Sequence, residues 1–493
     1  MRTPFAVLTG TTIDCWRRTL GLGLRSDGTK FGLSAFGLDL FSDVPRENRP
    51  ELSRESAEAH FVKRWTAFIA NEPEARWGLR HGTHLVERVP DRPDIVVARF
   101  SDDGRLEKLE PYLLEADGRA PARSEISKIS NALCAAHAAT GELPERERPQ
   151  HLLKMAQAEL NRNAGEISID SQRPDLRRIG GACQVSFEMM PESAGRCLPP
   201  DFRWRRTLGC CGLNVVARFS SDYCSVDVWL QIHHVASDGA PIQEMLLRVE
   251  KAWGIKSPPI FPKPRSSTQP VIRSVQPSPR DRPLFEVVDF LDFTPLLAWR
   301  ERINARYRES MGGDAPVVCA VLWKLAQQPE FKGKKFSTAV DVPPGENLPR
   351  AVDLVGIRPA DYTQSDEGFA EFARDYRLLL KKARLRSTPG WRMMQQIALL
   401  PPWLSVRALK LNAAQGRKIF GTIGVSMLKD ARVFCAPMED SGWYEGFVAI
   451  GNLALPAADG VKVAAVTARG GADTVRQYPG AICRAIASCN EII

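Results

Sequence analysis

The sequence predicts an α/β protein built from two similar halves. Segments with strand-like alternation and segments with helical spacing follow one another along most of the 493 residues. A segment rich in proline, serine and basic residues, 257–283, separates the halves. Because proline interrupts both helices and inner strands, we expect this segment to be an extended linker. Short residue patterns of the first half recur in the second, which indicates two similar domains rather than a solenoid.

The composition is that of a globular protein, with 44% hydrophobic and 25% charged residues. No run of about 18 apolar residues occurs, so we expect no membrane span. The first residues carry Asp14, Arg17 and Arg18 in place of an apolar stretch, so we expect no signal peptide.

The net charge is +9 and is spread along the chain with no block of like charges, which fits a solvated basic surface. The alternative is attraction to an anionic partner, such as a phosphate-bearing co-substrate or an acidic carrier protein. Since no nucleic-acid-binding motif occurs, we expect no nucleic acid partner.

The 11 cysteines form no metal-binding pattern. Cys210 and Cys211 are adjacent, and no C-x-x-C occurs, whereas zinc sites pair their ligands at short spacing. We therefore expect no metal, and we expect reduced, mostly buried cysteines in a cytoplasmic protein.

The expected elements of the first half follow from local periodicity. Helices are expected at 58–70, 106–114, 126–138, 151–160 and 240–250, and strands at 95–100, 182–187, 212–219 and 225–232. In the first helix, Phe61, Trp65 and Phe68 share one face, as core residues do. The strand at 225–232 alternates apolar and polar residues, which predicts a half-buried strand.

The second half repeats this mixture of elements. Strands are expected at 286–290, 336–342, 354–357, 422–427, 447–453 and 461–467, and helices at 295–307, 316–328, 369–383 and 475–487.

Three groups of matching residues indicate the duplication. The sequence Asp-Arg-Pro at 91–93 matches 281–283, the Gly-x-x-x-Val-Ser at 181–186 matches 421–426, and valines with an aspartate at 226–238 match 461–473. The offset grows between the groups, so we expect the second copy to carry an insertion that includes the strands between 336 and 357. The expected domains are an N-terminal segment of unassigned role packed on the first lobe (1–90), a first lobe (91–256), the linker (257–283) and a second lobe (284–493).

The residues that point to chemistry follow the strand at 225–232. The chain contains only 7 histidines, and two of them open the sequence His-His-Val-Ala-Ser-Asp-Gly at 233–239. A neutral imidazole, with a pKa of about 6.5, is a suitable general base at neutral pH. Asp238 can cap the following helix, and Gly239 can supply an unusual backbone angle. A histidine fixed at a strand end before such a turn suits acyl transfer, in which a hydroxyl, amine or thiol loses a proton as it attacks a thioester.

At these residues the chain resembles the CoA-dependent acyltransferase superfamily, whose signature is H-H/R-x-x-x-D-G. The superfamily includes chloramphenicol acetyltransferase, dihydrolipoyl acyltransferase cores and condensation domains. The resemblance implies that His234 is the general base, that His233 belongs to the motif and that Asp238 holds the loop by an ion pair. It also implies two chloramphenicol-acetyltransferase-like lobes that form a pseudo-dimer. Each lobe would have a mixed sheet with helices on one face, and the active-site tunnel would lie at the lobe interface.

The second half is most similar to a dihydrolipoyl acyltransferase core, chiefly through Gly-Thr-Ile-Gly-Val-Ser-Met-Leu at 421–428 and also through 293–304 and 339–341. In that family a serine of a G-T-x-x-x-S segment stabilises the oxyanion across a subunit interface, and Ser426 is the matching residue. The resemblance implies a coenzyme A or phosphopantetheine thioester as co-substrate, a small-molecule acceptor and no permanently bound cofactor. It also implies a monomer or small oligomer.

The chain departs from the family at the second copy of the motif. Arg469 stands where the base would be, with Asp473 after it, and a permanent cation cannot accept a proton. We therefore expect a single active site that uses both halves. Two alternatives remain open: a condensation-type domain that forms amides or esters between carrier proteins, and an inactive scaffold of the same fold.

Overall fold

A computed structural model describes most of the chain outside residues 1–29 and 114–182. The described residues are 30–72, 75–81, 86–89, 94–100, 106–113, 183–191, 196–200, 212–234, 236–257, 259, 261, 271–277, 283–344, 350–398, 404, 413–435, 444–453, 455–456 and 461–489. They belong to two compact units, an N-terminal unit that ends at Pro259 and a C-terminal unit that begins at Ile260. The expected helices at 126–138 and 151–160 lie outside the described residues.

The N-terminal unit is built on a mixed sheet. Its strands follow the order β1 (Lys30–Asp39), β8 (Ser225–His233), β7 (Leu213–Phe219), β6 (Cys183–Met189), β4 (Asp94–Phe100) and β5 (Leu106–Leu113). Strand β6 pairs in parallel with β4 and β7, and the other pairs are antiparallel. A separate hairpin pairs β2 (Gly78–His81) with β3 (Val86–Val89).

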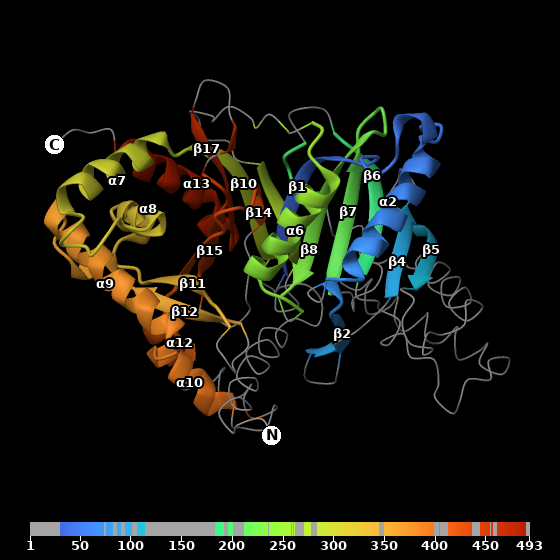
Figure 1. Cartoon of the computed structure of the whole chain (residues 1–493). Coiled ribbons are helices and arrows are strands. Elements are labelled where there is room, and N and C mark those ends of the chain that lie inside the picture. The colour runs from blue at the N-terminus through green and yellow to red at the C-terminus, as the bar shows by residue number, and fades with distance from the viewer. Residues whose placement is uncertain are drawn as a thin grey trace. The chain divides into compact units, whose positions relative to one another are not determined.

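Two helices of this unit lie across one face of the sheet: α2 (Arg54–Ile69) and α6 (Gly239–Trp253) (Figure 1). Ser53 caps the start of α2 by accepting a hydrogen bond from the Ser56 amide, as serine does at a helix N-terminus. The predicted aromatic face of α2 is confirmed for Phe61 and Trp65, which are fully buried, whereas Phe68 is only partly buried. The Phe61 and Trp253 rings meet edge to face at 5.5 Å, which joins the two helices in one core.

The C-terminal unit has its own mixed sheet. Its strands follow the order β12 (Ala351–Ile357), β11 (Phe336–Val342), β13 (Ile423–Met427), β15 (Gly446–Ile450), β17 (Lys462–Gly470), β10 (Pro283–Asp292) and β9 (Val271–Pro277), and β16 (Leu455–Pro456) pairs with β17. Strand β14 is the short segment Phe434–Cys435. The helices are α7 (Thr294–Tyr307), α8 (Val317–Ala326), α9 (Asp366–Arg384), α10 (Pro389–Ala398), α12 (Ala413–Phe420) and α13 (Ala472–Ala487).

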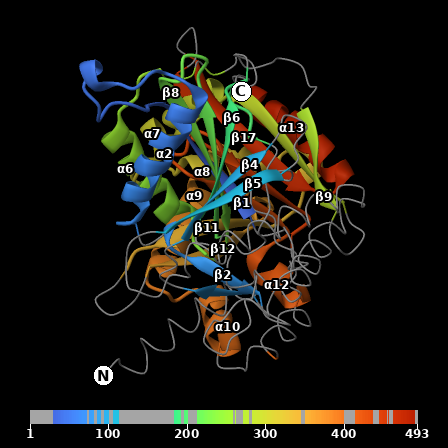
Figure 2. The same ribbon diagram turned by 90° about the vertical axis from the view of Figure 1, so that its right-hand side faces the viewer.

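The core of the C-terminal unit lies between one face of this sheet and helices α7, α8, α9 and α13. Val425, Val448 and Ala468 supply the sheet side of that core and are fully buried. Helices α10 and α12 lie beside the edge strand β12 (Figure 2). The predicted fold class is therefore confirmed: both units combine a mixed sheet with helices.

The topology of the two sheets reveals the duplication but corrects its alignment. Each sheet contains an antiparallel strand pair, β1 with β8 in the N-terminal unit and β10 with β17 in the C-terminal unit. Beyond this pair, both sheets continue with the same order of antiparallel, parallel, parallel and antiparallel pairings. The strands β7, β6, β4 and β5 therefore correspond to β15, β13, β11 and β12. Strand β4 thus matches β11, and the predicted match of 91–93 with 281–283 is wrong. The strands between 336 and 357 are not an insertion, because they correspond to β4 and β5. The first copy begins with β1, inside the segment 1–90.

Three local predictions are also wrong. Residues 106–113 form strand β5 instead of a helix; Pro111 disfavours a helix interior and is tolerated on this edge strand. Strand β8 is buried on both faces instead of one. The segment predicted as a linker contains strand β9, which pairs with β10.

Candidate active site

The His-His motif lies in the turn that joins β8 to α6. His233 is the last residue of β8 and is 2% exposed. Its amide donates to the carbonyl of Gly212, the residue before β7, at 2.9 Å. The amides of Ala236 and Ser237 both donate to the His233 carbonyl, at 2.8 and 3.3 Å. These bonds close a tight turn, so the backbone on either side of His234 is held by the sheet and by the helix.

The predicted roles of Asp238 and Gly239 in the backbone are only partly met. Asp238 occupies the N-cap position of α6, but its side chain makes no capping hydrogen bond. Gly239 is the first residue of α6 and has no positive φ. Asp238 therefore contributes through its contact with a side chain, described next, and Gly239 through its place at the start of the helix.

His234 and Asp238 lie next to each other. His234 Nε2 is 3.5 Å from Asp238 Oδ1, with the His234 side chain 14% and the Asp238 side chain 9% exposed. Phe31 of β1 contacts the imidazole edge to face, with ring centroids 5.4 Å apart. A carboxylate at this distance stabilises the imidazolium that forms when the ring accepts a proton, more strongly than it would in water because both groups are largely buried. The pair has the chemistry that a general base requires.

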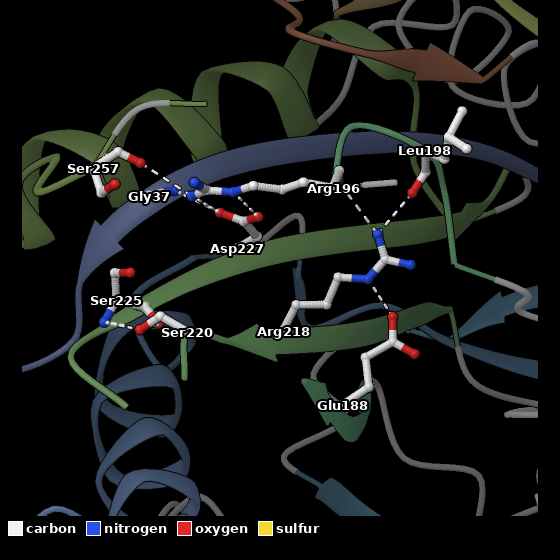
Figure 3. A network of polar contacts seen from close by, with 9 residues as sticks. All are labelled: Gly37, Glu188, Arg196, Leu198, Arg218, Ser220, Ser225, Asp227 and Ser257. Atoms are coloured by element: carbon white, nitrogen blue, oxygen red, sulfur yellow. Dashed lines mark hydrogen bonds and ion pairs between the residues drawn. The ribbon is translucent and has the colours of Figure 1, made fainter. Parts of the chain in front are cut away.

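A network of polar contacts anchors the other end of β8 (Figure 3). Asp227 is fully buried and accepts hydrogen bonds from Arg196 Nε at 2.7 Å, from Arg196 Nη2 at 2.8 Å and from the Gly37 amide at 2.7 Å. Arg196 also donates to the Ser257 carbonyl at 3.0 Å. The hydrogen bonds to Asp227 raise the pKa of Arg196, so the guanidinium stays charged. The network ties β8 to β1 and to the segments at 196 and 257, and thereby fixes the strand that ends in the motif.

A second arginine extends this network along the sheet. Arg218 of β7, the register partner of Asp227, donates to the Leu198 carbonyl at 2.7 Å and pairs with Glu188 of β6 (Figure 3). Its guanidinium lies over the Trp229 ring, 5.4 Å from the centroid. The polar residues of β8 predicted to face solvent thus sit inside a buried polar layer.

The same sheet face carries a row of amide side chains that local periodicity did not reveal, two of them buried and that of Gln231 partly buried. Gln184, Asn214 and Gln231 are register neighbours on β6, β7 and β8. Among the described residues, neither amide atom of Asn214 has a hydrogen-bond partner, nor does Gln231 Oε1. Buried polar groups are normally paired, so this row marks where water or a polar ligand would bind. The only sequence signal was the alternation of polar residues along β8, which also fits an ordinary solvent face.

Ser426 lies on β13 in the C-terminal unit and is 8% exposed. Its hydroxyl has no hydrogen-bond partner among the described residues. Its counterpart Ser186 on β6 is fully buried and donates to the Val215 carbonyl at 3.4 Å. The glycine that opens the Ser426 segment is required by the backbone: Gly421 has a φ of 99°, and a Cβ there would lie 2.4 Å from the Lys335 carbonyl oxygen.

The degenerate copy of the motif also lies in the C-terminal unit. Arg469 is the penultimate residue of β17 and is 7% exposed. Asp473 lies in the first turn of α13. The structure therefore brings together His233, His234, Asp238 and Gly239 in one turn, while Ser426, Arg469 and Asp473 belong to the other unit.

The described cysteines are free thiols, and burial raises the pKa of Cys183 and Cys197 to about 12. Within the described parts of the chain, no group of three or more histidine, cysteine or acidic side chains is arranged to hold a metal. No described helix is long and apolar enough to cross a membrane.

No family model and no curated protein sequence matches this chain. Its structure is similar to that of TRI101 from F. sporotrichioides in complex with coenzyme A and T-2, with 11% identity, 94% of this chain and 95% of that chain covered, and a TM-score of 0.43. It is similar to a condensation domain of the enacyloxin polyketide synthase, with 10% identity, 94% and 78% covered, and a TM-score of 0.39. It is also similar to a probable dihydrolipoamide acetyltransferase from Listeria monocytogenes, with 12% identity, 43% and 89% covered, and a TM-score of 0.30.

Proposed function

We propose that the protein is an acyltransferase that moves an acyl group from a thioester to a hydroxyl, amine or thiol. The observation that carries the proposal is the pairing of His234 with Asp238 in the turn after β8. The resemblance of residues 233–239 to the acyltransferase signature supports the same reaction.

In the proposed mechanism His234 is the general base. Its imidazole takes the proton of the acceptor as the acceptor's oxygen, nitrogen or sulfur attacks the thioester carbonyl. Asp238 stabilises the imidazolium while the tetrahedral intermediate exists. The intermediate collapses by breaking the C–S bond, and the imidazolium returns the proton to the departing thiolate. The acylated acceptor and the free thiol are the products, and the histidine ends neutral.

Ser426 is the proposed oxyanion donor. The Gly-x-x-x-Val-Ser segment and the hydroxyl without a described partner support this role, because a free hydroxyl can donate to the negatively charged oxygen of the intermediate. Since Ser426 and His234 belong to different units, the role requires both residues to reach one substrate carbonyl. Arg469 takes no part in the proposed chemistry.

The co-substrate is a coenzyme A or phosphopantetheine thioester, and the acceptor is a small molecule. A catalytically inactive scaffold of the same fold is the competing interpretation. The two are separated by incubating the whole chain with a panel of acyl-CoA thioesters and acceptors bearing hydroxyl, amine and thiol groups, and by measuring free thiol. Acceptor-dependent thiol release supports the acyltransferase. If no acyl-CoA and no acyl-carrier thioester releases thiol, the inactive scaffold is the interpretation that remains.

A further inference from the structure

Helix α9 and the residue that follows it expose two leucines on the side opposite the core. Its inner face packs into the C-terminal unit through Phe369, Phe372 and Tyr376, which are buried. On the outer face Leu378 is 52% exposed, and Leu385, which follows the last helical turn, is 67% exposed. These are the two most exposed large apolar side chains among the described residues. They lie seven residues apart, which places them on one side of the helix about 10 Å from each other.

Cations surround this pair of leucines. Lys381, Lys382 and Arg384 are exposed, and among the described residues none has a carboxylate within ion-pair distance. One turn earlier the situation differs, because Arg374 pairs with Glu371 at 3.5 Å and with Asp375 at 3.4 Å. Cations in the last turn favour any helix by opposing its dipole. That effect does not explain why two leucines are exposed beside them.

The pattern fits an acidic protein better than a membrane. A helix that lies on a bilayer presents a continuous apolar face with cations along its borders. In α9 the continuous apolar face is already buried in the core, and Lys381 and Lys382 fall between the two exposed leucines along the chain. Alternating charge and apolar contacts instead match a folded surface on which carboxylates surround a small apolar patch.

We propose that Leu378, Lys381, Lys382, Arg384 and Leu385 form the docking surface for an acidic acyl-carrier protein, which presents the donor thioester on its phosphopantetheine arm. This assignment rests on the proposed acyl transfer, and it names a carrier-bound thioester as the acyl donor. The leucines would contact an apolar patch on the carrier, and the three cations would pair with the carboxylates around it. Binding would then weaken with salt, because the exposed charges are screened.

The test measures carrier binding separately from chemistry. An acidic holo acyl-carrier protein, labelled with a fluorophore on its phosphopantetheine thiol, is titrated with the whole chain, and fluorescence anisotropy gives the Kd. We expect the double variant Lys381→Glu with Lys382→Glu to raise the Kd by about tenfold or more, which is the size expected for two reversed contacts at an interface. The variant Leu378→Ser with Leu385→Ser, which changes no charge, should weaken binding as well. The matched control is Lys332→Glu with Lys462→Glu, which alters net charge equally at two other exposed lysines and should leave the Kd unchanged.

Free thiol release from the acyl-CoA and acceptor pair that gives the highest rate should be the same in the Lys381/Lys382 variant and in the unaltered protein. An equal loss of carrier binding in the control variant would overturn the proposal, because only overall charge would then matter. Unchanged binding in the Lys381/Lys382 variant would overturn it too, as would lysine-dependent binding to phosphatidylcholine–phosphatidylserine vesicles without carrier binding. If the proposed chemistry is wrong, no acyl-CoA and acceptor pair releases thiol in any variant, and the anisotropy still reports docking.

Discussion

Removal of Arg196 tests how strongly the polar network holds strand β8. In the Arg196→Ala variant the fully buried Asp227 loses two of the three hydrogen bonds that it accepts, at 2.7 and 2.8 Å, and keeps only the Gly37 amide. It also loses the cation that compensates its charge. Breaking a buried ion pair by removing one partner costs about 3–5 kcal/mol, because the remaining charge stays out of water. The Arg196 side chain is 16% exposed, so we expect a value near 3 kcal/mol at the lower end.

The control for this variant is an ion pair with the same geometry on the surface. Arg350 donates to both carboxylate oxygens of Asp341, at 2.7 and 2.8 Å, but the two side chains are 28% and 38% exposed. Arg350→Ala should therefore cost no more than about 1 kcal/mol. The assay is urea unfolding followed by near-ultraviolet circular dichroism, which reports the buried tryptophans of both units and so covers both variants. An equal, small loss of unfolding free energy in both variants would show that burial of Asp227 does not strengthen the network's contribution to stability.

Three further predictions concern other residues. Ser426→Ala should lower kcat by about 10²–10³-fold with little change in KM, whereas Ser186→Ala should have a small effect on turnover; a normal kcat in folded Ser426→Ala would remove its oxyanion role. Arg469→Gln should leave thioester turnover intact if the protein stays folded, and a large loss would show that the second copy is active. Burial raises the pKa of Asp353 to about 6 from an unfolded value of 3.8, so its contribution to stability is present below the unfolded pKa and disappears as pH rises through about 6. Unfolding free energy should therefore fall by about 3 kcal/mol more in the natural protein than in Asp353→Asn between acidic and neutral pH, and parallel pH curves would contradict this.

The fold class and the turn at residues 233–239 were predictable because both depend on local signals. Strand β8 shows period-two alternation, the motif follows it directly, and α6 begins within one residue of the predicted start. Each of these features depends on a stretch of about ten consecutive residues. The resemblance implied that Asp238 holds the loop by an ion pair, but it did not predict that the partner is His234.

The remaining features depend on pairings between distant residues. Lys30 of β1 pairs with His233 of β8, so the start of the first copy could not be recognised without the sheet. Short matches such as Asp-Arg-Pro at 91–93 and 281–283 then gave a false alignment. The alternation of polar residues along β8 predicts a face exposed to solvent. Only the structure shows that Asp227 is bound by Arg196, 31 positions away. Burial on both faces is a property of the assembled sheet, and alternation along one strand cannot distinguish water from a buried ion pair.

The central claim is that His234 is the general base, and the most direct test is the acyl transfer rate of His234→Ala. The measurement is free thiol release from the acyl-CoA and acceptor pair that gives the highest rate with the natural protein, with circular dichroism to confirm folding. The account predicts a fall of about 10²–10⁴-fold, the usual contribution of general base catalysis. It also predicts that the loss persists at saturating substrate, since the base acts on the chemical step. A folded His234→Ala protein that releases thiol at the natural rate would contradict the account.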